Sequence, residues 1–237
     1  MKKRIVTIAL VVALLATCFA GTYAYLTDNA SKTNTFTVGS VDIELLESQL
    51  HRQNDQATDE QIIADAANYQ NYLATAGQNM VPGRWVKKAP YVQNTGKNPA
   101  YVRIRVIFTK KTVESLYFME YTTALNDKEK GIVRTINLLD ANREVLGTVN
   151  EYAEINTSGI DNWAYLEYVY NYIAPLAPNA VTYYAPFWQI ALKYDLNNSE
   201  LTAMADADKT IEVYADAIQS EGFDNYTEAF AAFNAQQ

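Results

Sequence analysis

The sequence predicts a mainly β protein. Three segments, 41–45, 101–108 and 211–217, alternate apolar and polar residues with a period of two. This period is typical of strands that bury one face. Two longer runs, 163–173 and 183–194, are rich in aromatic residues, which suit half-buried strands. Tyrosine is correspondingly frequent, with 18 among 237 residues.

The start of the chain predicts export. Basic residues at 2–4 precede an apolar run at 5–20, and small residues follow. A charged start, a short apolar stretch and small residues before a cut site define a secretory signal peptide. The apolar run is shorter than the ~20 residues of a membrane-spanning helix. We therefore predict a signal peptide over 1–24, with cleavage between Ala24 and Tyr25.

Two alternatives remain for this first segment. In one, the apolar run is retained as an N-terminal anchor. In the other, residues 15–18 (Leu-Ala-Thr-Cys) act as a lipobox with Cys18 as the lipidated residue. Thr17 departs from the Gly, Ala or Ser that usually precedes such a cysteine.

Cleavage changes the composition of the protein. Removing residues 1–24 takes away three positive charges and Cys18, the only cysteine, so the net charge falls from −8 to −11. The mature chain then forms no disulfide. Its acidity argues against nucleic-acid and anionic-membrane partners, because phosphates are bound by Lys and Arg. We also expect no stable membrane insertion after cleavage.

Helical patterns interrupt the predicted strands. Thr58 and Gln61 have the spacing of a capping box, residues 62–73 continue with helical spacing, and Gly77 fits the helix end. We assign this helix to an insertion at about 47–81.

Two further helices are expected later in the chain. One covers 112–121, and the other is a closing helix in which Tyr226, Phe230 and Phe233 share one face. We expect residues 38–237 to form one domain that contains the helical insertion.

Several segments, in a fixed order, resemble one known family. They are Tyr-Ala-Tyr-Leu-Thr-Asp at 23–28, Asn-Thr-Phe-Thr-Val-Gly at 34–39, Val-Pro-Gly-Arg-Trp-Val-Lys-Lys at 81–88, Val-Gln-Asn-Thr-Gly at 92–96, and Pro-Ala-Tyr-Val-Arg at 99–103. Together they resemble the TasA/camelysin family of exported proteins processed by a SipW-type signal peptidase. The stretch 213–223 is similar to the BsaA-like branch of biofilm matrix proteins.

The resemblance implies a fold, a function and partners. The fold is a jelly-roll-like antiparallel β-sandwich with a few short peripheral helices. The function is that of a structural subunit of extracellular fibres, in the biofilm matrix or at the cell surface of a Gram-positive-type bacterium. The partners are further copies of the chain, the SipW-type signal peptidase and a minor anchoring or accessory matrix protein. No cofactor is expected.

The segment after the predicted cut site suits strand exchange. Residues 25–37 lack proline and are rich in Thr, Asn and Ser, so they can add as a strand to the open sheet edge of a neighbouring subunit. We expect Tyr25, Leu26 and Thr27 to lie in the donated strand, with Phe36 anchored in the parent core. The alternative is an ordinary first strand of a monomer.

Lys32 lies within the same donor segment. If it met an Asn or Asp beside an acidic residue in a dry acceptor groove, an intermolecular isopeptide bond could join the subunits.

A competing class is an enzyme, because camelysin-like members of the family are described as metalloproteases. The mature chain has one histidine, His51, no cysteine and no His-Glu-x-x-His sequence, whereas zinc sites use several His or Cys ligands. We expect His51 to be a solvated loop residue, and His51→Ala to leave stability nearly unchanged. No catalytic residue and no metal ligand is assigned.

A third class is a monomeric adhesin or carbohydrate-binding sandwich. Exposed tryptophans would support it, and the candidates are Trp85, Trp163 and Trp188. Their more usual role is packing within a core or along a strand.

Overall fold

The computed structural model describes residues 27–30, 41–76, 80–151, 155, 159–196 and 211–236. The predicted signal peptide and its cleavage site, Ala24 and Tyr25, lie outside the described residues. Leu26, Lys32 and Phe36 of the predicted donor segment also lie outside them. Thr27 lies within the first described strand.

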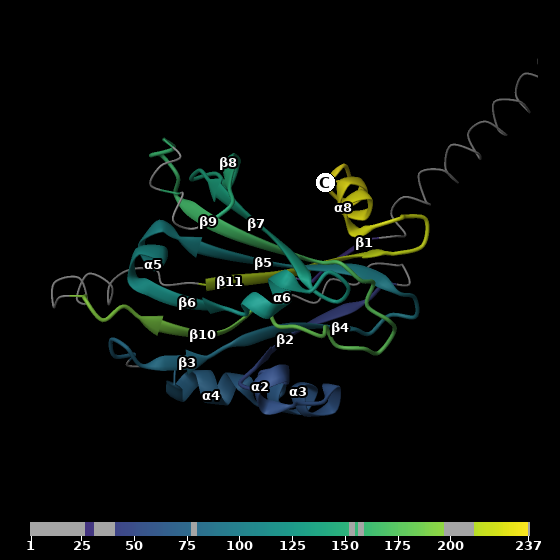
Figure 1. Cartoon of the computed structure of the whole chain (residues 1–237), viewed down its shortest axis with the longest axis horizontal. Coiled ribbons are helices and arrows are strands. Elements are labelled where there is room, and N and C mark those ends of the chain that lie inside the picture. The colour runs from purple at the N-terminus through teal and green to yellow at the C-terminus, as the bar shows by residue number, and fades with distance from the viewer. Residues whose placement is uncertain are drawn as a thin grey trace, which may run out of the picture.

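The chain folds as a mainly β, antiparallel sandwich with short peripheral helices, as the sequence predicts (Figure 1). One layer is a six-stranded sheet in the order β1-β11-β5-β9-β7-β8. Its strands are β1 (Thr27–Ala30), β11 (Ile211–Gln219), β5 (Ala100–Thr109), β9 (Tyr165–Tyr172), β7 (Ile132–Leu139) and β8 (Val145–Val149).

The opposite layer combines two smaller ladders. Their strands are β2 (Ile43–Ser48), β4 (Ala89–Asn94), β3 (Trp85–Lys87), β10 (Phe187–Leu192) and β6 (Leu116–Glu120). β2 pairs with β4, and β10 lies between β3 and β6. The N–H of Lys88 donates to Trp188 O (2.9 Å) and that of Asn94 to Ala180 O (3.0 Å). β3 and β4 therefore lie alongside the segment 180–192, and both are hydrogen-bonded to it.

The core fills the space between the two layers. On β5, Val102, Ile104 and Val106 are fully buried and face this core. Between them, Arg103 and Arg105 point to the outer face of the six-stranded sheet, where they line a groove. The alternation thus turns one face of β5 to the core and carries both arginines on the other face, as the period of two predicts.

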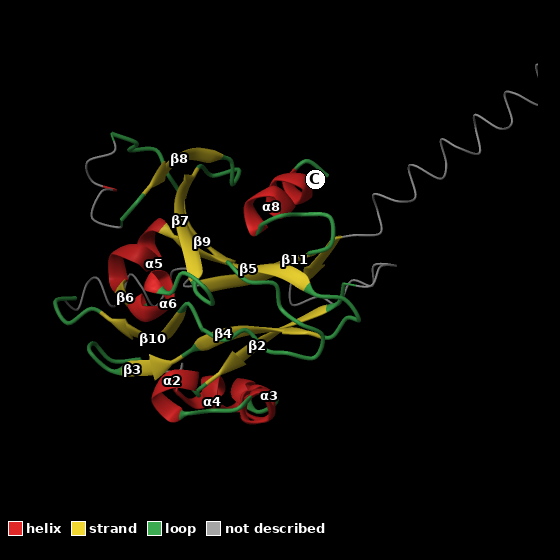
Figure 2. Cartoon of the chain, turned by 45° about the vertical axis from the view of Figure 1, so that its right-hand side comes forward, coloured by secondary structure: helices red, strands yellow, loops and turns green. Residues whose placement is uncertain are grey.

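The described helices lie outside the two layers, except for the two within 110–126, which bury Val113 and Ala124 in the core between the layers. The helices are α2 (Arg52–Asp55), α3 (Asp59–Ala66), α4 (Tyr69–Ala76), α5 (Lys110–Ser115), α6 (Thr122–Asn126) and α8 (Tyr226–Asn234). Figure 2 shows α2, α3 and α4 beneath the β2–β4 layer, while α8 and β8 rise from the outer face of the six-stranded sheet. Phe230 and Phe233 of α8 are buried against Tyr101 and Ile218, which confirms the predicted closing helix.

The helix predicted between Thr58 and Gly77 is two helices. The capping box is present, since Thr58 and Gln61 exchange side-chain and backbone hydrogen bonds. The helix then breaks after Ala66 because Tyr69 and the next turn pack on β3. The Tyr69 hydroxyl donates to Lys87 O (3.1 Å), and the Tyr72 hydroxyl accepts from Lys87 N–H (3.0 Å).

The helix predicted at 112–121 is wrong in its second half. α5 ends at Ser115, and Leu116–Glu120 form β6, which pairs with β10. Main-chain hydrogen bonds to β10 outweigh the local helical spacing, because tertiary pairing commonly overrides propensity.

Candidate functional site

The described part of the predicted donor segment, β1, lies at one edge of the larger sheet. β1 pairs antiparallel with β11 in the register Thr27↔Ile218 to Ala30↔Ala215. On the β11 side, Ala215, Ala217 and Ile218 are fully buried. Without β1, this stretch of β11 would be an open edge bordered by buried apolar side chains, which is the template that a donated strand requires.

Of the predicted donor residues, only Thr27 falls within the described residues. In the single chain, β1 occupies the β11 edge of its own subunit, as an ordinary first strand would. Exchange of this strand between subunits stays a prediction.

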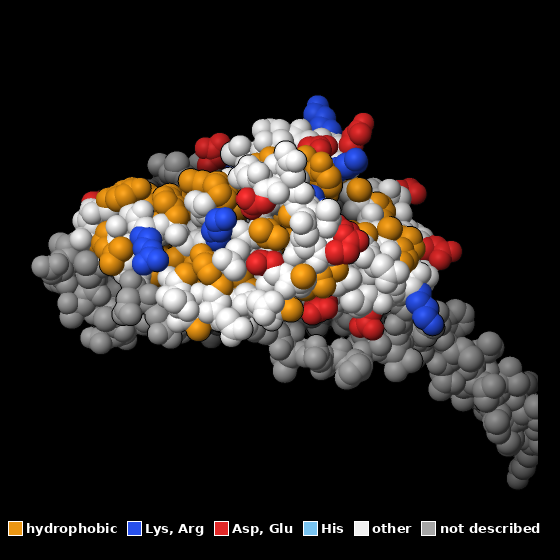
Figure 3. Space-filling view, turned by 90° about the horizontal axis from the view of Figure 1, so that it is seen from below, with side chains coloured by type: hydrophobic (Ala, Val, Ile, Leu, Met, Phe, Trp, Pro, Cys, Tyr) orange, Lys and Arg blue, Asp and Glu red, His pale blue; other side chains and the backbone are white. Residues whose placement is uncertain are grey.

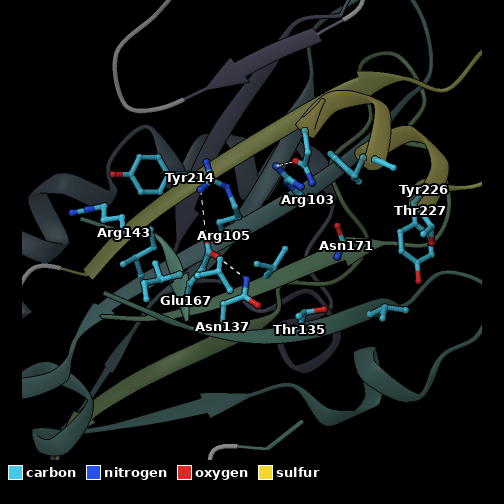
Figure 4. Close-up of a pocket in the computed structure, with 18 residues that line it drawn as sticks. Arg103, Arg105, Thr135, Asn137, Arg143, Glu167, Asn171, Tyr214, Tyr226 and Thr227 are labelled. Carbon is cyan, nitrogen blue, oxygen red and sulfur yellow. Dashed lines mark hydrogen bonds and ion pairs between the residues drawn. The ribbon is translucent and has the colours of Figure 1, made fainter. Parts of the chain in front are cut away.

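A second candidate site is a groove of about 800 Å³ on the outer face of the same sheet (Figure 4). Residues of β5, β9 and β7 form its floor. Residues directly opposite in an antiparallel ladder share a face, so whole rows across these strands line the floor together. Two such rows are Arg105–Val169–Thr135 and Ile107–Glu167–Asn137. The groove was not predicted from the sequence.

Two arginines of β5 share one buried carboxylate beside this floor. Asp216 Oδ2 accepts from Arg103 Nε (2.6 Å) and from Arg105 Nε (2.8 Å), and its side chain is only 2% exposed. Arg103 Nη2 also donates to Asn234 of α8 (3.0 Å). The pair of arginines thereby joins β11, β5 and the C-terminal helix.

The hydrogen-bonded series continues across the rest of the sheet. Arg105 Nη1 donates to Glu167 Oε1 (3.2 Å), Asn137 Nδ2 donates to Glu167 Oε2 (2.9 Å), and the Thr148 hydroxyl donates to Asn137 Oδ1 (3.0 Å). Burial alone would lower the pKa of Arg105, but Asp216 and then Glu167 outweigh it, so its pKa is raised. The arginine remains charged and fully paired.

The turn between β7 and β8 closes one end of the groove. Arg143 adopts a left-handed φ of 70°, and its guanidinium reaches Glu212 on β11 with two hydrogen bonds, of 2.6 and 2.8 Å. These bonds lower the pKa of Glu212. The Tyr214 hydroxyl also donates to Glu212. At the other end, α8 supplies Tyr226 and Thr227 (Figure 4).

His51 is not the solvated loop residue that its polar neighbours in the sequence predict. It is 1% exposed, and its ring centroid lies 4.4 Å from that of Tyr121 and 5.5 Å from that of Trp188. Its Nδ1 accepts from Asn54 N–H (3.3 Å) and caps α2. The solvated environment on which the expectation of a neutral His51→Ala rests is therefore wrong. We now expect it to cost about 2 kcal/mol or more, because it empties a buried site.

Acidification is expected to destabilise the protein through His51. Burial lowers the pKa of His51 below 6.5, and Asp55 only partly opposes this. The folded state thus favours the neutral ring, so this part of the stability is complete above about pH 6.5 and is lost as the pH falls below it. We expect His51→Asn, which keeps a capping acceptor, to lose less stability than the native protein between pH 7.5 and 5. Thermal unfolding at both pH values measures this, and equal losses would contradict it.

The three tryptophans differ in exposure. Trp163 is buried, and Trp188 packs against the apolar cluster beside α3. Trp85 is half-buried and lies on the small sheet beside Tyr117 (ring centroids 6.4 Å apart), and Tyr117 in turn contacts the exposed Tyr194. Figure 3 shows hydrophobic side chains spread over this lower face, with Asp and Glu mostly on one half of it.

One part of the chain matches the model of a known protein family. The model of the camelysin metallo-endopeptidase family matches residues 1–65. The resemblance read from the first of the quoted segments is therefore confirmed over this part, and it indicates an exported protein. The BsaA-like detail is not confirmed. No curated protein and no solved structure gives a significant match.

The described residues do not provide the group of ligand side chains that the metal of a metallo-endopeptidase needs. Within the described ranges, no three His, Cys, Asp or Glu side chains group closely enough to hold a metal ion. His51 uses Nδ1 as a helix cap, and Nε2 faces a buried environment without a hydrogen-bond partner among these residues. In the same part of the chain, no helix has the length and apolar character needed to cross a membrane.

Proposed function

We propose that the chain is a structural subunit of extracellular biofilm matrix fibres. Subunits assemble head-to-tail when the N-terminal segment 25–37 of one completes the sheet of the next. The observation that supports this most strongly is the place of β1, a four-residue edge strand on β11 that lies directly after the predicted cleavage site. Such a strand is held mainly by main-chain hydrogen bonds, which a neighbouring copy supplies equally well.

The geometry of this exchange favours filaments over closed rings or dimers. The donor is the N-terminal segment, and the acceptor is the β11 edge, so the two surfaces of the contact differ. A head-to-tail contact that does not close generates an open filament. Cleavage by a SipW-type signal peptidase would release the donor only after export, and a minor accessory protein would anchor the fibre.

Electron microscopy of the purified secreted protein tests this function. We expect long, unbranched filaments that form at neutral pH without any added partner. A protein that remains monomeric at high concentration would contradict the fibre role.

Cleavage of the signal peptide can be tested separately. We expect N-terminal sequencing of the secreted protein to begin at Tyr25, because Ala24 is the small residue that precedes the donor segment. A mature N-terminus at a lipid-modified Cys18 would contradict this, and would leave the donor segment tethered to a membrane.

The alternative function, a camelysin-like secreted metalloprotease, rests on the description of the matched family alone. A third candidate is a monomeric surface adhesin with Trp85 at its binding surface. The position of β1 at the sheet edge suits the fibre role, which requires a first strand that a neighbouring copy can supply.

A further inference from the structure

The groove on the six-stranded sheet carries an inference beyond fibre assembly. We propose that it binds a neutral, hydroxyl-rich oligosaccharide chain. Its volume of about 800 Å³ lies within the range of about 300–1,000 Å³ that ligand sites occupy. The groove lies on the outer face of the sheet, and its lining does not include residues 215–218 of β11, which pair with β1, so the proposal stands whether or not the subunits polymerise.

The charges in the groove favour an uncharged ligand. Arg103 and Arg105 are bound to Asp216, Arg105 also to Glu167, and Arg143 to Glu212. Each charged side chain that lines the groove in the described part of the chain is therefore paired with an opposite charge. An anionic or cationic ligand would have to break one of these pairs, which a neutral ligand need not do.

One half of the groove carries uncharged hydrogen-bonding groups that the protein does not use. Asn171 on β9 and Thr135 on β7 are half-buried on the floor, and Tyr226 and Thr227 face them from α8 (Figure 4). Among the described residues, none of these four side chains has a hydrogen-bond partner. Hydroxyl and amide groups both donate and accept, which matches the hydroxyl groups of a sugar.

Apolar surface lies beside these polar groups. Val133 on β7, which lies opposite Asn171, and Val145 on β8 both line the groove and are exposed. A pyranose ring presents hydroxyl groups at its rim and C–H groups on its faces. The groove offers a counterpart to both, as small-molecule sites do when an apolar lining holds a few placed polar groups.

A peptide fits this groove less well than a sugar. Extended peptides gain most of their affinity by adding a strand to a sheet edge. The groove floor is a sheet face, on which the backbone groups of β5, β9 and β7 are already bonded to neighbouring strands. A peptide would find side chains here but no open main-chain ladder.

Isothermal titration of the purified secreted protein tests the proposal. The probes are maltohexaose, cellohexaose and chitohexaose as neutral chains, polygalacturonate as an anionic chain, and a synthetic peptide of residues 25–37. The variant Thr135→Val/Asn171→Leu removes two of the four unused polar groups, those on the floor, while keeping side-chain size. The matched control Thr123→Val/Gln70→Leu makes the same kind of change at exposed positions of α6 and α4.

We expect at least one neutral chain to bind the native protein and the control alike. The groove variant should bind it about tenfold more weakly or worse, since each lost hydrogen bond is worth on the order of a factor of ten. Unchanged melting temperatures would show that both variants are folded. No binding of any neutral chain, equal binding by the groove variant, or a preference for polygalacturonate or the peptide would each overturn the proposal.

Discussion

Replacing Asp216 with alanine is expected to destabilise the protein by about 3–5 kcal/mol. The substitution leaves Arg103 and Arg105 without the carboxylate that both of them bind, at 2.6 and 2.8 Å. Arg103 has a side-chain exposure of only 9%, so water cannot replace the lost partner. The loss should appear as a lower midpoint in urea or thermal unfolding.

Glu212→Ala is the matched control for this prediction. Glu212 lies on the same strand and also binds an arginine, but its partner Arg143 is 41% exposed. Exposed ion pairs are worth at most about 1 kcal/mol. Similar losses in the two variants would contradict the account of a buried, shared carboxylate on β11.

Deleting residues 25–34 is expected to abolish filament growth while leaving a folded monomer. The deletion removes β1, which pairs with residues 215–218 of β11, and leaves the rest of the six-stranded sheet in place. Size-exclusion chromatography and electron microscopy should show monomers only. Normal filaments from the truncated protein would rule out donor-strand exchange, even if the fibre function remained.

A peptide of residues 25–37 should bind the truncated monomer and raise its melting temperature. A ligand that binds only the folded state stabilises it by about 2.7 kcal/mol at a hundredfold excess over its dissociation constant. A scrambled peptide of the same composition is the control, because strand addition needs the side chains of the donor in register.

The strands that the sequence predicts best are those with the simplest alternation. Residues 101–108 and 211–217 became β5 and β11, with Ile104 and Ala215 facing the core. The same signal exists in β7, where Ile132, Ile136 and Leu138 are buried. No strand is predicted for this segment above, although its apolar residues alternate with a period of two.

Other features depend on packing between distant segments. His51 is buried against Tyr121 and Trp188, which lie far along the chain. Its polar sequence neighbours therefore predict a solvated environment that the fold does not provide. The buried carboxylate of Asp216 also escapes sequence reasoning. It occupies a position that alternation assigns to the outer face, and that face is covered by α8 at this end of the sheet.

The groove could not be predicted from the sequence for a similar reason. Asn137, Glu167 and Arg105 come from three strands that the sheet order brings together. No spacing along the chain connects them. The composition of residues 25–37 and their place after the predicted cut site are local properties that the sequence shows, whereas the pairing of β1 with β11 is a property of the fold.

Disulfide trapping tests strand exchange most directly. Ala30 lies opposite Ala215 in the β1–β11 ladder, and opposite residues in such ladders are about 4.5–5.5 Å apart, within reach of a disulfide. The chain after Tyr25 has no cysteine of its own. Filaments grown from an equal mixture of Ala30→Cys and Ala215→Cys proteins should yield covalent dimers on non-reducing gels, and the doubly substituted protein should yield a ladder of multimers. If the mixture gives no dimers and the double variant gives only an internally linked monomer, each subunit keeps its own first strand and donor-strand assembly is wrong.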